Sequence, residues 1–195
     1  MNGGLKEKVL ISKNRYLNHG IETYLLLIQY HSAIIENKAI LGGINMFFRK
    51  AQIGDSNILS NIAYKSKAYW GYTEDFIQKC KDTDALTVTK EYIEKNSVYL
   101  VETDNEIVAF YSFDINEQKL DALFIEPDYI GKGLGKIIWD HLLNKAKELE
   151  LNEFTIDSDP NAEGFYLKMG AENIGSTPST VFPDRSLPLM KVKVN

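Results

Sequence analysis

The most constraining stretch of this chain is a strand-like run that leads into a glycine-rich loop and then a helix. The apolar run 120–125 is closed by Pro127, and glycines follow at positions 131, 133 and 135. After the loop, apolar residues recur at helical spacing: Leu134, Ile138, Leu142, Ala146 and Leu149. Glycines let backbone N–H groups approach a ligand closely, and a helix start adds partial positive charge. The segment therefore predicts a phosphate or pyrophosphate site.

Two familiar phosphate-binding loops do not fit this spacing. The P-loop of nucleotide triphosphatases needs a glycine where Ile130 stands, and a serine or threonine where Ile137 stands. The dinucleotide fingerprint needs its third glycine at the position of Lys136, and it belongs to the first strand of its domain. A nucleotide-phosphate enzyme is therefore the weakest of the functional alternatives.

A second motif lies downstream of the expected helix, after a short expected strand at 153–158. It reads Pro160-Asn-Ala-Glu-Gly-Phe-Tyr-Leu-Lys-Met-Gly170. Pro160 and Asn161 suit a turn that enters a helix, and Gly170 suits the helix end.

In this order, the two motifs resemble those of the GNAT superfamily of acyl-CoA-dependent N-acetyltransferases. Gly133 and Gly135 fill the glycine positions of its pyrophosphate loop. Ile130 replaces the usual arginine or glutamine, which matters little if backbone amides do most of the binding. The resemblance implies an α/β (α+β) fold: a mixed, mainly antiparallel, V-splayed sheet of about seven strands with helices on both faces.

The resemblance also implies a function. The chain is expected to bind acetyl-CoA and to transfer the acetyl group directly to a primary amine of a small molecule or peptide, within a ternary complex. An acyl chain longer than acetyl is left open. The alternative is a non-catalytic acyl-CoA-binding module, which would keep the cofactor cleft without turnover.

The family's cofactor contacts carry over by position. Backbone groups of the strand are expected to pair with pantetheine and polarise the carbonyl. Loop residues are expected at the pyrophosphate, the Asn161 side chain at the pantetheine arm, and Tyr166 by the thioester sulfur. The expected cofactor residues are Leu123, Phe124, Ile125, Ile130, Gly131, Lys132, Gly133, Leu134, Gly135, Lys136, Asn161, Phe165 and Tyr166. Tyr166 is the expected general acid, because a phenol is protonated at neutral pH; the alternative is a tyrosine that only packs on the cofactor.

Two carboxylates are candidates for the general base. The resemblance implies a base on this strand, four residues before its last apolar position, which is Asp121 here. Strand alternation predicts Asp121 on the same face as Leu123 and Ile125, and so directed toward the acceptor. Glu126 is the second candidate, just after the bulge that the family places on this strand. The alternative for both is an ordinary solvated carboxylate, because a carboxyl group with a pKa near 4 is a poor base for an amine.

Aromatic residues between two expected helices are candidates for the acceptor pocket. Trp70 and Tyr72 are expected to contact the substrate, and the alternative is packing between helices. The loop 177–186 is long enough to cover the acceptor mouth. His141 has no second histidine or cysteine at ligand spacing, so no metal site is expected. Cys80 is expected to pack in a helix.

The first 45 residues are surplus to the resemblance. We expect an acetyltransferase domain at 46–195 and an N-terminal extension at 1–45. The codons for Gly42 to Met46 can contain a ribosome-binding sequence followed by ATG, so one hypothesis is that Met46 is the native start. The alternative is a genuine extension, with a helix at 21–36 that docks or dimerises.

The composition limits the classes of protein to which the chain can belong, but it does not indicate a function. The chain has 195 residues, which suits one core, and one cysteine, which excludes an intramolecular disulfide and suits a reducing cytoplasm. Its formal net charge of −5 argues against nucleic acid as a partner and mildly favours cationic amines. No apolar run is long enough to cross a membrane. A homodimer is compatible with the family.

Overall fold

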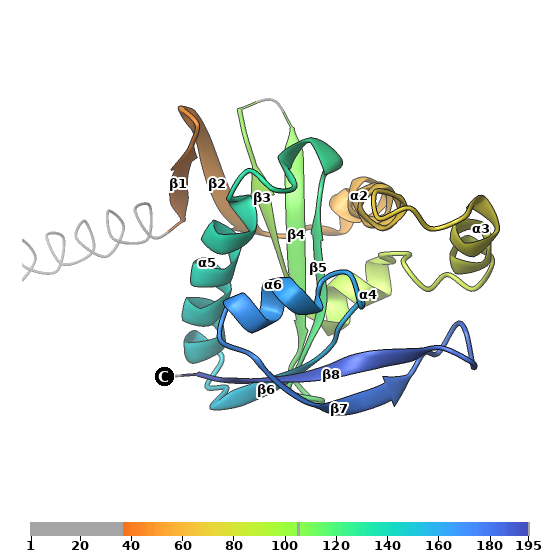
Figure 1. The fold of residues 1–195 in the computed structure, drawn as a ribbon. Coiled ribbons are helices and arrows are strands. Elements are labelled where there is room, and N and C mark those ends of the chain that lie inside the picture. The colour runs from red at the N-terminus through yellow and green to blue at the C-terminus, as the bar shows by residue number, and fades with distance from the viewer. Residues whose placement is uncertain (1–36, 105, 195) are drawn as a thin grey trace, which may run out of the picture. The chain divides into compact units, whose positions relative to one another are not determined.

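The computed structural model describes residues 37–104 and 106–194. Its eight strands form one sheet in the order β1-β2-β3-β4-β5-β6-β8-β7 (Figure 1). The strands are β1 (Lys38–Leu41), β2 (Ile44–Lys50), β3 (Ser97–Glu102), β4 (Ile107–Asp114), β5 (Lys119–Ile125), β6 (Glu153–Asp157), β7 (Glu172–Pro178) and β8 (Ser186–Lys193). The α-helices are α2 (Ser56–Ala68), α3 (Glu74–Asp82), α4 (Lys90–Lys95), α5 (Leu134–Glu148) and α6 (Glu163–Lys168), and short 3₁₀ turns are η1 (Ile53–Asp55) and η2 (Pro127–Tyr129).

The sheet splays apart between β5 and β6. These two strands are parallel, and their register contains a single pair, Lys119 with Thr155. The neighbouring pairs β2–β3, β3–β4, β4–β5, β6–β8 and β7–β8 are all antiparallel. Figure 1 shows β6, β8 and β7 running crosswise below β2 to β5. This is the V-splayed, mainly antiparallel sheet that the sequence predicts.

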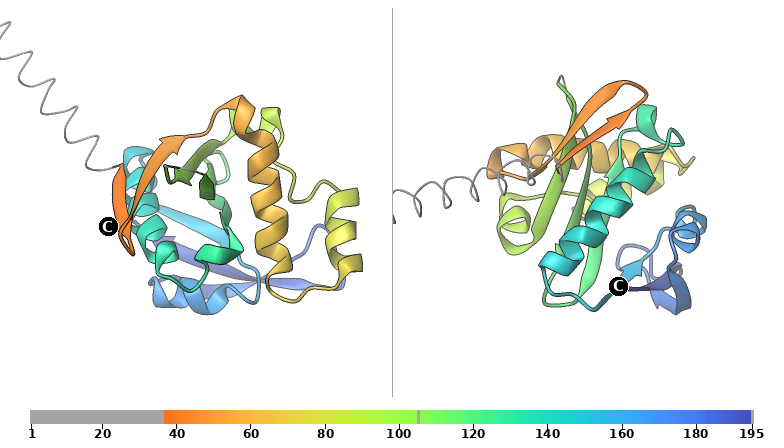
Figure 2. Two further views of the ribbon diagram at one scale, coloured as in Figure 1. Left: turned by 90° about the horizontal axis from the view of Figure 1, so that it is seen from above. Right: turned by 90° about the vertical axis from the view of Figure 1, so that its left-hand side faces the viewer.

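Helices cover both faces of the sheet, as expected. One core cluster contains the apolar face of α5, with Leu134, Ile138 and Leu142 fully buried, together with Tyr166 of α6. The other contains Leu59 of α2 and residues of α4 and the opposite sheet face. Figure 2 shows α5 on one side of the central strands and α2 with α4 on the other. We call these the α5-side core and the α2-side core.

The sheet begins before Met46. β1 precedes that residue, and β2 starts two positions before it, at Ile44. Leu41 packs on the α5-side core, and Met46 itself is fully buried. That translation starts at Met46 stays a prediction, and the helix expected at 21–36 lies outside the described residues. Across the part of the chain that the structure describes, no helix is both long and apolar enough to cross a membrane.

A buried polar pair in the α5-side core confers acid sensitivity. The Tyr111 hydroxyl and His141 Nδ1 lie 2.8 Å apart, and the imidazole stacks on Phe48. Burial, helped by nearby Lys145, lowers the pKa of His141 from 6.5 to about 4. Between these values the folded protein binds fewer protons at this site than the unfolded chain does. The stability tied to neutral His141 is therefore fully present above pH 6.5 and is lost as pH falls toward 4.

We expect protonation at His141 to lower the free energy of unfolding by about 2 kcal/mol between pH 7 and pH 5. Urea titrations of the wild type and of His141→Gln at both pH values measure this, because the amide cannot titrate. Carboxylates lower the free energy of unfolding equally in both proteins. The readout is therefore the difference between the decrease in the wild type and the decrease in His141→Gln. Equal falls in the two proteins would contradict the assignment.

Candidate functional site

The glycine-rich loop presents backbone N–H groups that no described residue accepts. Gly131 and Gly133 have φ of 76° and 97°, in the left-handed region that favours glycine. Gly133 is the N-cap residue of α5, and because it is a glycine it has no side chain to accept from the first amides of the helix. Within the described chain, no backbone carbonyl accepts from the amides of Gly131, Gly133, Leu134 or Gly135. Successive open amides of this kind at a helix start make an anion-binding concavity.

Other loop residues contribute differently from what the sequence predicts. The amides of Ile130 and Lys132 donate to Pro127 and Tyr129 at 3.1 and 3.4 Å, so they are engaged within the turn. The Leu134 side chain is fully buried, which leaves its amide as its only contribution. The exposed Lys136 pairs with Asp140, one helical turn on. The anion site therefore centres on the three glycines and Leu134.

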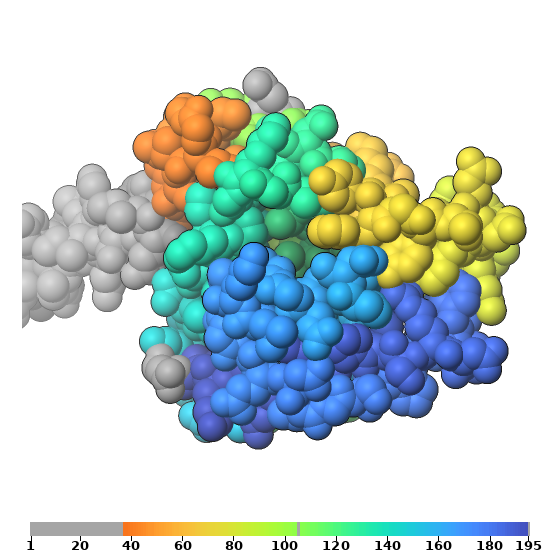
Figure 3. All heavy atoms as spheres, in the orientation of Figure 1, coloured from red at the N-terminus to blue at the C-terminus, as the bar shows by residue number. Residues whose placement is uncertain are grey.

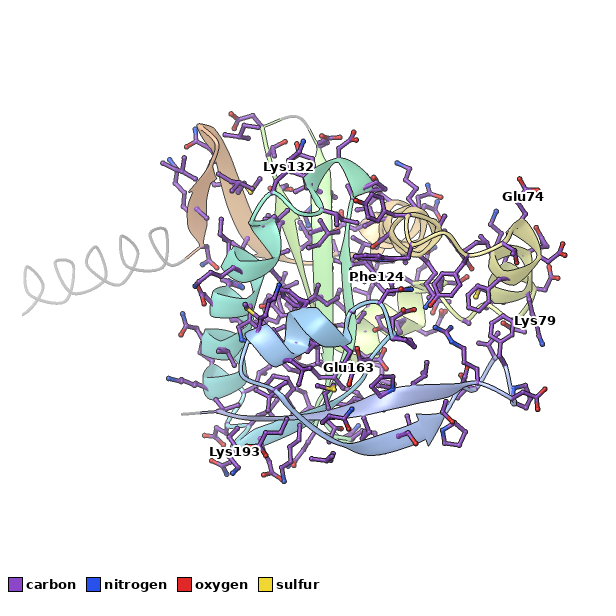
Figure 4. The ribbon with its side chains drawn as sticks, viewed as in Figure 1. Glu74, Lys79, Phe124, Lys132, Glu163 and Lys193 are labelled. Atoms are coloured by element: carbon purple, nitrogen blue, oxygen red, sulfur yellow. The ribbon has the colours of Figure 1, made fainter. Side chains whose placement is uncertain are left out.

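Lys132 lies on the side of the loop that faces the β1–β2 hairpin (Figure 4). There it lines a cavity of about 380 Å³ with Leu41, Gly42, Ile44, Glu106, Asp128 and Tyr129. A Cβ at Gly133 would lie 3.7 Å from the Leu41 side chain. The residues just before Met46 therefore lie beside the glycine loop.

The two sequence motifs meet at Gly135. A Cβ there would lie 3.0 Å from the Phe165 ring, closer than ordinary contact, so the glycine leaves room for α6 beside the start of α5. Trp139, one turn further along α5, lies 6.1 Å from Phe165 and 5.8 Å from Tyr166 between ring centroids. The structure thus brings the loop and the second motif into one site, as the sequence predicts.

Tyr166 is buried, with 6% of its surface exposed. Among the described residues, none is in hydrogen-bond contact with its hydroxyl. Burial, helped by the negative charge of Asp159, raises the pKa of Tyr166 well above its ordinary value. The phenol is therefore protonated at neutral pH and has a proton to donate to a ligand.

Only alternate amides of β5 face the open side of the splay. The Glu126 amide donates to Val108 of β4 at 2.8 Å, and ladder alternation directs the Phe124 amide to β4 as well. The prediction that the Phe124 amide pairs with pantetheine is therefore wrong. The amides of Leu123 and Ile125 point to the other edge. That of Ile125 lies 3.5 Å from Ser66 Oγ on α2.

Sequence reasoning missed Ser66, although a signal was present. Ser66 continues the stripe of buried residues on α2 formed by Leu59, Ile62 and Ala63. A serine at an apolar position of an amphipathic helix needs a partner, because a buried hydroxyl without one costs free energy. Here the Ser66 hydroxyl accepts from the Ile125 amide of β5 at 3.5 Å.

A β-bulge changes the direction of Asp121. Ala122 pairs with Ser112 and Leu120 with Phe113, so Asp121 is the extra residue of β5. Leu123 and Ile125 pack on the α5-side core. The Asp121 carboxylate instead accepts from the Tyr92 hydroxyl at 2.6 Å, and Tyr92 packs on the α2-side core. The prediction that Asp121 shares a face with Leu123 and Ile125 is therefore wrong, because the bulge shifts the alternation.

The bulge also changes the setting of Glu126. It lies at the end of β5 rather than just after the bulge, which corrects the expected position. Its carboxylate pairs with Lys65 of α2 at 2.8 Å. The Tyr92 hydroxyl contacts both Asp121 and Ser112, so Asp121 belongs to a chain of hydroxyl groups and Glu126 to an ion pair.

The fold brings Asn161 and Tyr72 into contact, whereas Trp70 lies apart from this pair. The Asn161 amide nitrogen donates to the Tyr72 hydroxyl at 3.2 Å, which joins the second motif to the connection between α2 and α3. Trp70 is 43% exposed and packs edge-on against Tyr69. Cys80 is buried in α3, as expected.

A hollow on the surface collects these elements. In Figure 3 it lies between the start of α5, the α2–α3 connection and α6, with the central strands at its floor. Figure 4 shows Phe124 beside α2, in agreement with its packing on the α2-side core. The glycine loop, the open edge of β5 and the second motif therefore all border one depression, which a long, anionic ligand can span.

Comparisons with known proteins agree with this geometry. Residues 59–180 match the acetyltransferase (GNAT) domain family. The chain is 31% identical over 104 residues to the peptidyl-lysine N-acetyltransferase YjaB of Salmonella typhimurium, covering 53% of this chain and 69% of that protein.

Solved structures show the same fold. A GCN5-related N-acetyltransferase from Rhodopseudomonas palustris matches with a TM-score of 0.65 at 16% identity, covering 80% of this chain and 98% of that one. The PaiA N-acetyltransferase of Thermoplasma acidophilum, solved with coenzyme A, matches with a TM-score of 0.58 at 21% identity, covering 76% and 98%. The chain therefore belongs to the GNAT family and is an N-acetyltransferase that uses acetyl-CoA.

Proposed function

We propose that this acetyltransferase moves the acetyl group directly to a primary amine of a small molecule or peptide, with both substrates bound together. The observation that carries the proposal is the run of open amides at Gly131, Gly133, Leu134 and Gly135, beside a buried tyrosine with a free hydroxyl. The similarity to a peptidyl-lysine N-acetyltransferase supports an amine acceptor.

Acetyl-CoA supplies the activated acyl group, and the chain supplies binding and proton transfer. We assign the pyrophosphate to the open loop amides, and the pantetheine arm to the free edge of β5 and to Asn161. The Ile125 amide is placed to orient the carbonyl, since its hydrogen bond to Ser66 Oγ is long, at 3.5 Å. The Tyr166 hydroxyl holds the proton that the departing thiolate needs.

Asp121 is our candidate for the base that takes the proton of the amine. The bulge exposes its carboxylate, and Tyr92 holds it in place. Glu126 is the weaker candidate, because its charge is already compensated by Lys65. Trp70 and Tyr72 remain proposed acceptor contacts.

We expect Asp121→Asn to lower kcat/KM at pH 7 about 100-fold, with a smaller loss at pH 9, where more of the amine is deprotonated in solution. Glu126→Gln should change kcat/KM by less than about threefold. Full pH–rate profiles of both variants measure this. A profile of Asp121→Asn that superimposes on the wild type would remove Asp121 from the mechanism, and a loss confined to Glu126→Gln would transfer the role.

Thiol release from acetyl-CoA in the presence of an amine panel tests the function. We expect release that depends on both acetyl-CoA and an amine, with acetylated amine found by mass spectrometry. Calorimetric binding of acetyl-CoA without release for any amine would favour a non-catalytic acyl-CoA-binding module. The single cysteine leads us to propose a cytoplasmic location. A homodimer remains a proposal that sedimentation can test.

A further inference from the structure

Three side chains from three segments converge on one carboxylate next to the proposed transfer site. Asp159, between β6 and α6, contacts Lys67 of α2 and accepts from the Tyr72 hydroxyl at 2.9 Å. Arg185, in the connection between β7 and β8, lies 3.3 Å from Asp159 and also contacts the Tyr72 hydroxyl. We call Lys67, Tyr72, Asp159 and Arg185 the Asp159 cluster.

The Asp159 cluster has an excess of positive charge. Two cations share one carboxylate, and the side chains of Lys67 and Arg185 are only 14% and 21% exposed. Arg185 uses Nη2 for both of its contacts, and within the described residues its Nε and Nη1 have no partner. Partly buried positive charge is poorly solvated, so a second anion here is stabilising.

Stacked aromatic rings hold the two cations in place. Tyr72 stacks on Phe76 with centroids 4.3 Å apart, and Phe76 stacks on Phe182 at 4.1 Å. Lys67 Nζ and Arg185 Cζ lie 4.9 and 5.0 Å from the Tyr72 ring centroid. These cation–π contacts fix the positive groups without neutralising them. The aromatic stack therefore offers an apolar wall beside fixed positive charge.

The cluster borders the second motif on its acceptor side. Asn161, assigned to pantetheine, donates to the Tyr72 hydroxyl at 3.2 Å. Asp159 is close enough to raise the pKa of Tyr166, although burial is the larger cause. An acceptor held at Lys67 and Arg185 would thus lie next to the group that we assign to the thioester.

We propose that Arg185 and Lys67 bind a carboxylate of the acceptor, so that the substrate class is a primary amine that also carries a carboxylate. This rests on the proposed acetyl transfer to an amine. A carboxylate complements the excess charge, and the chain between it and the amine lies along the aromatic wall. The overall net charge of −5, which mildly favours cationic amines, does not describe this local site.

Matched acceptors test the proposal. Thiol release is measured with 4-aminobutanoate against butylamine and with 6-aminohexanoate against hexylamine, since each pair differs by the carboxylate. Lysine peptides with and without a neighbouring glutamate distinguish a peptide carboxylate from a small molecule. We expect KM to be about 10-fold to 100-fold lower for the carboxylate member of a pair. Arg185→Gln should remove this difference, and Arg185→Lys should restore part of it.

Lys79→Gln is the matched control. Lys79 lies over the Phe182 ring at 4.6 Å, between α3 and the β7–β8 turn, and has no contact with Asp159 (Figure 4). The Lys79→Gln substitution removes one positive charge from the same region, and the variant should keep the lower KM for the carboxylate member of each pair. The melting temperature of each variant shows whether the fold is retained.

Several outcomes would overturn the proposal. The first is equal KM values within each pair, and the second is a lower KM for the alkylamine. The third is an Arg185→Gln variant that loses activity equally with both members of a pair, as expected if Arg185 only stabilises the fold. Turnover with alkylamines alone would refute the carboxylate and leave the acetyltransferase assignment intact. Absence of turnover with every amine would refute the proposed function, and this inference with it.

Discussion

Replacing Tyr166 by phenylalanine should lower kcat about 100-fold or more, while the dissociation constant of acetyl-CoA changes little. Phenylalanine keeps the ring contacts with Trp139 and Phe165 and removes only the hydroxyl. The loss arises because that hydroxyl, protonated and without a described partner, is the group assigned to the departing thiolate.

Steady-state kinetics at saturating acetyl-CoA, with calorimetry for binding, separates the two roles of Tyr166. Tyr64→Phe is the control, because it removes a phenol hydroxyl that lies 2.9 Å from Thr87 Oγ1 and has no part in the proposed site. If Tyr166→Phe retains the wild-type kcat, Tyr166 is a packing residue. A loss confined to acetyl-CoA affinity would lead to the same conclusion.

Valine at Gly135 should weaken acetyl-CoA binding about 10-fold to 100-fold, because overpacking of this kind costs about 1–3 kcal/mol. The first added carbon would meet the Phe165 ring at 3.0 Å and the Ile125 side chain at 3.7 Å. Relief of that clash must shift the Phe165 ring, which lies next to Tyr166, or move α6 or the start of α5, and we expect either change to disturb the spacing between the open amides and the second motif.

Calorimetry with acetyl-CoA measures the effect at Gly135. Gly164→Ala is the matched control: it lies on α6 beside Phe165, and a Cβ there meets nothing within 4 Å. That variant should bind acetyl-CoA as the wild type does. Wild-type affinity in Gly135→Val would show that contact between the two motifs is not needed for the cofactor site.

Local sequence patterns were sufficient for the parts of the site that local chemistry determines. The left-handed conformations at Gly131 and Gly133 require glycine, and the apolar spacing from Leu134 onward gives α5 its buried face. The family resemblance then supplied the splay between β5 and β6. The glycine conformations and the buried face of α5 depend on residues that are near one another in the chain.

Features that depend on register or on distant segments were not predictable in this way. Strict alternation placed Asp121 on the wrong face, because a bulge is an irregularity of pairing with β4 and leaves no clear mark in β5 alone. The Asp159 cluster escaped notice since Lys67 and Arg185 are far apart in sequence and meet only in the folded chain.

We assign the diphosphate of coenzyme A to the open main-chain donors at residues 131–135. Amide NMR spectra of the ¹⁵N-labelled protein, titrated with coenzyme A and separately with pantetheine, test it most directly. We predict that coenzyme A causes the largest shifts at the amides of Gly131, Gly133, Leu134 and Gly135, and that pantetheine, which lacks the diphosphate, leaves them nearly unchanged. Unshifted loop amides at millimolar coenzyme A, or equal shifts with pantetheine, would contradict the account.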